Sequence, residues 1–478
     1  MKFDMINIYA SLPEIIVIVS ACALLIIDLF LKKEQKRLVA YLSLAVVIIA
    51  AGETWRIAGN PLLVFDKMFI VDNYAIFFKM LFYLATFLAI LLSINYIKIE
   101  EIEHSEYYIL MLFALSGMML MASGADLLTI YLGLELMALP IYMLVGFMKK
   151  DIKSNEASMK YIVLGALSSG ILLYGISLIY GLTGTTQLSE LAAVLKKQTD
   201  IDSAVILSTI FLVAGFGFKV AAVPFHMWAP DAYEGAPTSI TAFMSVGSKA
   251  AAFAVFLRVL LDALSPVSLN WIALISAISV VTMILGSVVA LVQTNIKRML
   301  AYSSIGHAGY ALLGFVAGGS DGIASVMLYM LIYAFMNMGI FGAIIIMRKG
   351  GIVGDNIEDY TGLAKVHRGI ALLMLIFLFS LAGIPPTAGF VGKFYIFMAL
   401  IHKGFIALAV IAALTAAISA YFYIRIIMLM YMKEPLHKFD LAQTPATRIA
   451  LAIAAAGTII IGILPAWFIE LVQKAVFS

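Results

Sequence analysis

The stretch GIALLMLIFLFSLAGIPPTAGFVGKFYIFMALIH, residues 369–402, is apolar enough to lie in a lipid bilayer but too long for one straight crossing. Pro385 and Pro386 stand in its middle, and proline ends or kinks a helix because it has no backbone N–H. Lys393 follows them in the same apolar run. The stretch therefore predicts a discontinuous membrane helix that carries a buried lysine close to its break.

The composition of the whole chain agrees with a membrane location. Of 478 residues, 63% are hydrophobic and 12% are charged, against roughly 25% charged in a soluble domain. The net charge of +3 is small and scattered, which argues against nucleic acid as a partner. The single cysteine, Cys22, excludes an internal disulfide and a cysteine-ligated metal or iron–sulfur site. We therefore expect no cofactor and no metal in this chain.

Apolar segments recur along the chain at the length of a bilayer crossing, which is about 20 residues. Only helices satisfy their backbone groups alone in lipid, so the sequence predicts an all-α integral membrane protein with about fourteen transmembrane helices. The first is too long for a signal-peptide core, so we expect it to be retained. The expected spans are 12–31, 38–57, 74–97, 107–122, 125–148, 159–182, 203–225, 238–261, 270–293, 299–317, 322–347, 369–402, 405–431 and 446–473.

Lysine and arginine in the short loops predict the orientation, because cytoplasmic loops carry the excess of these residues. The loops of one side hold Lys32, Lys33, Lys36, Arg37, Lys149, Lys150, Lys153, Lys297, Arg298, Arg348, Lys349, Lys365, Arg368, Lys433, Lys438 and Arg448. The loops of the other side hold little beyond Lys67, Lys196, Lys197 and Lys403. We therefore expect both termini on the side away from the cytoplasm, which is the periplasmic side in a bacterial inner membrane.

A short string suggests an internal repeat. Residues 214–219, AGFGFK, recur as residues 388–393, AGFVGK, and prolines stand near both copies. Five spans separate the copies, so the two units must cross the membrane in opposite directions, an arrangement of inverted repeats found in transporters. The expected organisation is three N-terminal helices in 1–106, a first five-helix repeat in 107–265, a second, inverted repeat in 266–433, and a C-terminal helix in 434–478. The discontinuous helices are the seventh and the twelfth.

Ionisable side chains stand inside the apolar spans. A charge at the centre of a membrane helix costs roughly 2.5 to 3.5 kcal/mol, so such residues indicate a functional site for protons or ions. The candidates for proton transfer are Glu135, Lys160, Lys219, Lys249, His307 and Lys393.

Residue type indicates a role for several of these groups. An ammonium group that loses its hydration releases its proton more readily, and a nearby carboxylate restores the charged form. Glu135 is the only carboxylate well inside the spans from 125 to 261, which makes it the natural partner of Lys219. Separating this pair would send a proton from Lys219 toward Lys249. His307 is suited to relaying it between the two halves, and Lys393 would accept it on the exit side.

Each assignment has a structural alternative. A lysine near the end of its helix can extend its ammonium to the membrane surface, and this applies most to Lys160, which stands beside a basic loop. Glu135 could serve packing or capping, and His307 could be a hydrogen-bonded core histidine. Arg258 and Arg425 are expected to be interfacial anchors. His226, Asp231 and Glu234 are residue types that bind metals, but their spacing favours an ordered loop, and Gly350, Gly351 and Gly354 lack the lysine and hydroxyl residue of a phosphate loop.

One stretch is specific enough to indicate a family. Residues 224–238, PFHMWAPDAYEGAPT, lie between Lys219 and Lys249, and GLEL at 133–136 and YSSIGH at 302–307 accompany them. Together they resemble the antiporter-like membrane subunits of bacterial NADH:quinone oxidoreductase, respiratory complex I, and the resemblance covers essentially the whole chain. Met227, Tyr233 and Lys393 fit the N-type branch better than the L and M types or the Mrp-type antiporters. The end of the chain at Ser478 leads us to expect no long lateral helix of the L type.

The resemblance implies a function for the chain. Members of this family are thought to translocate protons, driven by quinone reduction in neighbouring subunits. It implies that Glu135 and Lys219 form the first pair, that Lys249 is the central lysine and that Lys393 belongs to the broken helix, with Lys160 and His307 on the same polar axis. NADH, flavin, iron–sulfur clusters and quinone would be bound by other subunits of the complex. The expected partners are the sister antiporter-like subunit, small membrane subunits and the lipid bilayer.

Two other functions remain open. An Mrp-type cation/proton antiporter would work without a redox partner. A passive scaffold subunit would use its buried charges only to hold helices together.

Overall fold

The computed structural model describes residues 5–32, 35–59, 61–197, 202–348, 354–436 and 441–476. Within these ranges, twelve helices are long and apolar enough to cross a membrane. They are α3 (Arg37–Arg56), α4 (Asn73–Ile99), α5 (Glu106–Ser123), α6 (Leu127–Val145), α7 (Ile152–Thr183), α9 (Ser203–Val220), the composite helix 238–263, η4 with α13 (Ser268–Leu291), α14 (Ile296–Ala317), α15 (Gly319–Met347), α19 (Ile406–Met432) and α20 (Pro445–Ile463).

Two further crossings complete the predicted set. Helix α2 (Leu12–Asp28) has 17 residues, and the twelfth crossing is divided into α17 (Arg368–Ala382) and α18 (Ala388–His402). The break lies at Pro385 and Pro386, as predicted. Every expected span thus has a helix in the described residues, which confirms the all-α membrane fold.

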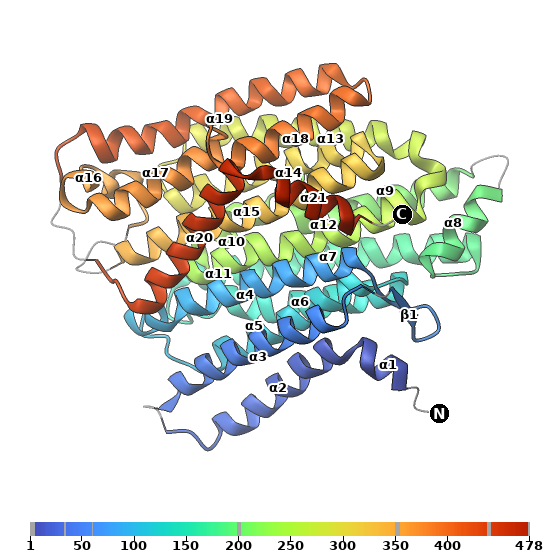
Figure 1. Ribbon diagram of the computed structural model, residues 1–478, viewed down its shortest axis with the longest axis horizontal. Helices are drawn as coiled ribbons and strands as arrows, with labels where there is room; N and C mark the ends of the chain where they lie inside the picture. Colours follow the sequence, from blue (N-terminus) through green and yellow to red (C-terminus); the bar gives the residue numbers. More distant parts are fainter. Residues whose placement is uncertain are drawn as a thin grey trace.

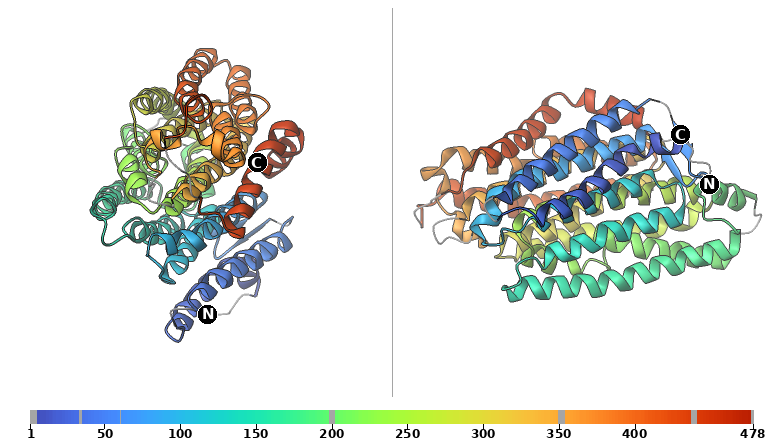
Figure 2. Two further views of the ribbon diagram at one scale, coloured as in Figure 1. Left: turned by 90° about the vertical axis from the view of Figure 1, so that its left-hand side faces the viewer. Right: turned by 90° about the horizontal axis from the view of Figure 1, so that it is seen from below.

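The helices run side by side in one bundle (Figure 1), in which α2 and α3 form an outer pair (Figure 2, left). Short helices complete the fold. Figure 1 shows α1 (Met5–Ala10) and α8 (Leu188–Lys197) at one end of the bundle and α16 (Leu363–Val366) at the other. The others are α10 (Trp228–Gly235), η5 (Ile357–Tyr360) and α21 (Pro465–Ala475). The described ends of the chain lie at one end of the bundle, together with α8 and the hairpin of β1 (Leu62–Val64) and β2 (Phe69–Val71) (Figure 1).

Several boundaries differ from the sequence prediction. The last span was expected to reach residue 473, but Pro465 starts a separate helix and α20 ends at Ile463. The segment between the seventh and eighth crossings, expected to be a loop, contains α10. The hairpin was not predicted. Lys33, Lys349 and Lys438, which were counted in the orientation argument, and Gly350 and Gly351 lie outside the described residues.

Two buried ion pairs join the third crossing, α4, to the first and to the eighth crossing. Lys79 of α4 and Glu14 of α2 approach to 2.6 Å, with side chains that are 0% and 3% exposed. Arg258, in the eighth crossing, pairs at 2.9 Å with Asp72, which also caps α4. Arg258 was expected to be an interfacial anchor, but it is buried and paired, because Asp72 supplies a carboxylate at that depth.

We expect Lys79→Met to destabilise the protein by about 3–5 kcal/mol, because it leaves the Glu14 carboxylate buried without a counter-ion. The double variant Glu14→Gln/Lys79→Met should recover most of that loss. Lys67→Met is the control, because Lys67 pairs with Glu190 at the surface and such pairs contribute about 0–1 kcal/mol. Thermal unfolding of the detergent-solubilised protein measures all three, and equal losses in Lys79→Met and Lys67→Met would contradict the assignment.

Candidate functional site

Lys219 lies at the end of α9, two residues before the helix break. The chain leaves the helix through Ala221, whose backbone is left-handed, and Ala222 N donates to Gly217 O at 2.8 Å to close the cap. The Lys219 side chain is 3% exposed, and its Nζ donates to the Tyr142 hydroxyl at 3.1 Å. Gly165 makes room for this contact, because a Cβ at that position would lie 2.0 Å from the same hydroxyl.

Glu135 does not contact Lys219 directly. It lies on α6, seven residues before Tyr142, and therefore on the same face of that helix about two turns away. One of its carboxylate oxygens, Oε1, is buried and has no hydrogen-bond partner among the described residues, although the charge acts on Lys219 through space. The sequence predicted the pair of Glu135 and Lys219, but not Tyr142, whose hydroxyl binds the lysine.

Lys249 starts α12 (Lys249–Arg258), directly after the π-helical turn η2 (Met244–Ser248). Turns of this kind interrupt the regular backbone pattern and are frequent at functional sites. The side chain is 2% exposed. Its Nζ donates to the Ser304 carbonyl at 2.8 Å and to the Ser304 hydroxyl. The central lysine is thus held by α14 through neutral oxygens.

Ser304 bonds Lys249 and also Tyr333, whose ring packs against His307. The Tyr333 hydroxyl donates to Ser304 Oγ at 2.8 Å, and the Tyr333 ring packs against the imidazole of His307 with centroids 5.5 Å apart. His307 is buried and bonds through both nitrogens, Nδ1 to the Tyr329 hydroxyl at 2.6 Å and Nε2 to the Tyr423 hydroxyl at 3.1 Å. Each of these hydroxyl groups can both donate and accept a hydrogen bond. Hydrogen bonds thus join Lys249 to Tyr333 through Ser304, and join His307 to Tyr329 and Tyr423, while ring packing brings the two groups together.

A small cavity of about 10 Å³ lies next to His307. Its polar lining comes from Ser287, Ser303, His307, Tyr310, Ser419 and Tyr423. This volume is close to the minimum for one water molecule. Tyr310 lines this cavity, and Lys393 Nζ lies 5.1 Å from the centroid of the Tyr310 ring.

Lys393 lies on α18, in the second half of the broken crossing. Its Nζ donates to the carbonyls of Leu381 at 3.0 Å and Ala382 at 2.9 Å, the last residues of α17. Gly383 follows with φ +86°, and a Cβ there would lie 2.9 Å from Lys393 Cδ. The helix break thus provides both the carbonyl oxygens that bind the ammonium and the space beside it.

The two helix breaks match each other, but not in the register of the repeated string. Ile384 N donates to Phe379 O at 2.9 Å, as Ala222 N donates to Gly217 O, and Gly383 takes the left-handed position of Ala221. Leu381 is therefore the counterpart of Lys219. Both lysines lie at a helix break, but the repeated string does not give them the same position, because Lys219 precedes its break and Lys393 follows its own.

Lys160 does not join this buried series. Its ammonium is partly exposed and pairs with Glu156 at 2.7 Å and with Asp231 of α10 at 2.8 Å. Arg298 joins Asp231 to Glu234, and Lys153 also binds Glu234. These residues line a cavity of about 210 Å³. Partial burial raises the pKa of Asp231, but hydrogen bonds from Lys160 and Arg298 outweigh it and hold that pKa below its ordinary value.

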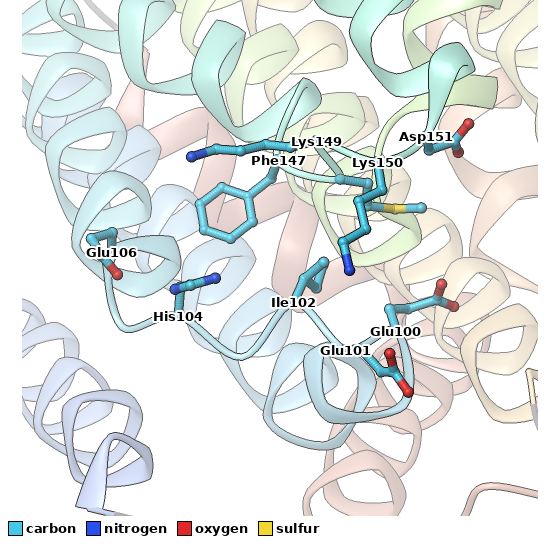
Figure 3. A pocket seen from close by; sticks show the side chains of 10 residues that line it. Glu100, Glu101, Ile102, His104, Glu106, Phe147, Lys149, Lys150 and Asp151 are labelled. Carbon is cyan, nitrogen blue, oxygen red and sulfur yellow. The ribbon is translucent and has the colours of Figure 1, made fainter. Parts of the chain in front are cut away.

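A larger hollow of about 610 Å³ lies beside this cluster, between the segments that join α4 to α5 and α6 to α7. Figure 3 shows carboxylates and lysines side by side in its lining. Glu100 also pairs with Arg348 at 2.6 Å. Among the described residues, no group of three or more His, Cys, Asp or Glu side chains is arranged to hold a metal ion.

A family model described as NADH:quinone oxidoreductase/Mrp antiporter, TM, matches residues 124–419. Subunit N 2 of the NADH-quinone oxidoreductase of Rhizobium meliloti (strain 1021) is 59% identical over 469 residues, which cover 98% of each chain. The chain belongs to the subunit N family of NADH-quinone oxidoreductases. This confirms the family predicted from the stretch between Lys219 and Lys249.

Solved structures of related subunits share this fold. A chain of respiratory complex I from Thermus thermophilus with bound aureothin has a TM-score of 0.81 and 29% identity, covering 96% of this chain and 98% of its own. A chain of the Mrp complex from Dietzia sp. DQ12-45-1b has a TM-score of 0.85 at 22% identity, covering 98% of this chain and 97% of its own. The second likeness shows that the fold is shared.

Sequence reasoning missed the hydroxyl groups that join the charged residues. These are Tyr142, Ser304, Tyr329, Tyr333 and Tyr423. A weak signal exists, because Tyr142 stands seven residues from Glu135 and Ser304 stands three residues from His307, spacings that place side chains on one helix face. Lys79 and Glu14 were missed as well, and their spacing in the sequence carries no signal of contact.

We expect the stabilising effect of Asp231 to depend on pH. The folded state lowers the pKa of Asp231, so its ion pairs stabilise the fold at neutral pH. This stabilisation is lost as the pH falls from about 3.9, the ordinary pKa of an aspartate, through the lowered pKa of the folded state. Asp231→Asn should lower the unfolding midpoint by about 2 °C at pH 7, and the difference should vanish in acid. Glu101→Gln is the control, and a pH-independent difference for Asp231→Asn would contradict the ion-pair account.

Proposed function

We propose that this chain is a proton-translocating membrane-arm subunit of an NADH-quinone oxidoreductase. Quinone reduction elsewhere in the complex drives proton transfer along the polar axis, which we define as Glu135, Lys219, Lys249, His307 and Lys393 with the hydroxyl groups that bind them. The observation that carries this proposal is the run of buried contacts from Lys249 through Ser304 and Tyr333 to His307, and from His307 toward Lys393.

The partners of the lysines support a relay in preference to a scaffold. Lys219, Lys249 and Lys393 donate to a hydroxyl group or to backbone carbonyls, and none of the three forms an ion pair with a described carboxylate. Losing a proton from Lys249 or Lys393 leaves no paired carboxylate behind. A charge that merely held helices together would be expected to pair as Lys79 and Arg258 do.

The chemistry follows from the order of the groups. Glu135 stabilises the ammonium form of Lys219 through space, so a movement that weakens this interaction favours release of the proton toward Lys249. Ser304 bonds both Lys249 and Tyr333, and the Tyr333 ring packs against His307, so the proton would pass from this hydroxyl pair to the imidazole next to it. The imidazole accepts a proton at one nitrogen and gives it up at the other, and Lys393 receives it beside the helix break. Lys160 lies at the outer end, where its exposed cluster would collect protons from the surface.

The proposal includes the surroundings of the subunit. The chain lies in the bacterial inner membrane, with its lysine-rich loops in the cytoplasm and both termini on the periplasmic side. Three N-terminal helices (1–106) precede two inverted five-helix units (107–265 and 266–433) and a last helix (434–478). The partners are the sister antiporter-like subunit and small membrane subunits, and NADH, flavin, iron–sulfur clusters and quinone serve electron transfer in other subunits.

The test is donor-driven proton uptake by inverted membrane vesicles that contain Glu135→Gln. We expect the rate of uptake to fall about tenfold or more, because the charge that reloads Lys219 is gone. Glu190→Gln is the control, since it removes an exposed carboxylate that pairs with Lys67 at the surface and belongs to neither the polar axis nor the Lys160 cluster. Electron transfer from NADH to an artificial acceptor that bypasses the quinone shows that the complex assembles. Unchanged uptake in assembled Glu135→Gln would overturn the proposed role.

A further inference from the structure

A third cavity on the lysine-rich end of the bundle differs from the two already described. It has a volume of about 520 Å³ and lies where α17 and α20 begin. Arg368 and Arg448 stand at its mouth, together with His367 and Gln443, and no carboxylate is among the described residues that line it. The other two hollows contain several carboxylates each. Among the described residues of its lining, this cavity therefore presents positive charge without a carboxylate to neutralise it.

Neither arginine has an ion-pair partner in the described part of the chain. Both residues are exposed, and the Arg448 side chain donates from Nε to Gln443 Oε1 at 3.3 Å. The two guanidinium groups thus keep most of their donors available. Such donors match the oxygen atoms of a phosphate group in geometry and charge.

The start of α17 adds a second, independent feature. No side chain caps its first turn, so the backbone N–H groups there and the positive end of the helix dipole are available to an anion. Gly369 lies in that turn, and a Cβ added to it would meet nothing within 4 Å. An anionic group can therefore approach the backbone closely at this point.

Below the charged mouth, the lining becomes apolar. It consists of Ile346, Ile370, Leu373, Leu451 and Ala452. Leu373 follows Arg368 by five residues and Leu451 follows Arg448 by three, so these side chains lie roughly one turn deeper along membrane-crossing helices. The cavity thus has a cationic rim at the helix ends and an apolar wall toward the membrane interior. A free phosphate ion would use only the rim.

We infer that this cavity binds an anionic phospholipid, with its phosphate between Arg368 and Arg448 and its acyl chains along α17 and α20. Basic pockets between transmembrane helices on the cytoplasmic side bind anionic headgroups in other membrane proteins. The bound lipid would join the first half of the twelfth crossing to the last crossing, because α17 and α20 both line the cavity. This site is separate from the polar axis and does not depend on the proposed proton transfer.

The test labels the assembled, detergent-solubilised complex with photoactivatable phosphatidylglycerol or, in parallel, photoactivatable phosphatidylcholine. Cross-linked peptides of α17 and α20 are quantified by mass spectrometry. We expect phosphatidylglycerol to label these peptides in preference to phosphatidylcholine. In Arg368→Gln/Arg448→Gln the phosphatidylglycerol signal should fall roughly 25-fold, because each arginine near an anionic headgroup contributes about fivefold. Equal labelling by the two lipids, or unchanged labelling in the double variant, would overturn the inference.

Further variants separate this site from general effects of charge or folding. Gly369→Leu keeps both arginines but fills the space beside them, and it should also abolish the labelling. Arg37→Gln should leave it unchanged, because Arg37 begins a crossing at the same end of the bundle but pairs with Glu103. Excess inorganic phosphate should not displace the lipid. Displacement by phosphate would show a site for the free ion and would overturn the phospholipid assignment.

Discussion

Each charge in the membrane interior must be satisfied by the protein itself, because neither lipid nor bulk water solvates it there. The chain meets this requirement in two ways. Lys79 and Arg258 face carboxylates, whereas Lys219, Lys249 and Lys393 face hydroxyl or carbonyl oxygens. A carboxylate partner fixes the charge, because removing the proton leaves an uncompensated anion. A neutral oxygen tolerates both the charged and the uncharged lysine, and this difference separates the polar axis from the ion pairs that hold helices.

A helix interruption supplies the neutral oxygens that bind Lys393, and interruptions also lie next to Lys219 and Lys249. The last carbonyls of a helix have no partner within it, so a helix break leaves them available to a side chain. Leu381 and Ala382 offer their carbonyls to Lys393 because α17 ends there. At Lys249 the interruption is the π-turn that precedes it. The irregular backbone therefore lies where the chemistry of the site needs it.

The sequence predicted the crossings, the broken twelfth helix and the ionisable residues, because hydrophobic length, proline and charge in an apolar run are local signals. It failed where contacts depend on packing between distant helices. The bond from Lys219 to Tyr142 joins residues 77 positions apart, and the pair of Glu14 and Lys79 joins two crossings that the sequence treated as plain spans. The similar sequences at 214–219 and 388–393 did not predict where each lysine lies relative to its helix break, because sequence similarity does not fix that register.

The most direct test of the polar axis removes one hydroxyl group from it. Tyr333→Phe keeps the shape of the side chain but deletes the bond to Ser304. Tyr107→Phe is a matched control, because this buried hydroxyl bonds Ser239 away from the axis. In donor-driven proton uptake by vesicles with equal amounts of assembled complex, uptake should fall about tenfold in Tyr333→Phe and stay normal in Tyr107→Phe. Equal rates in the two variants would contradict proton transfer through this line of contacts.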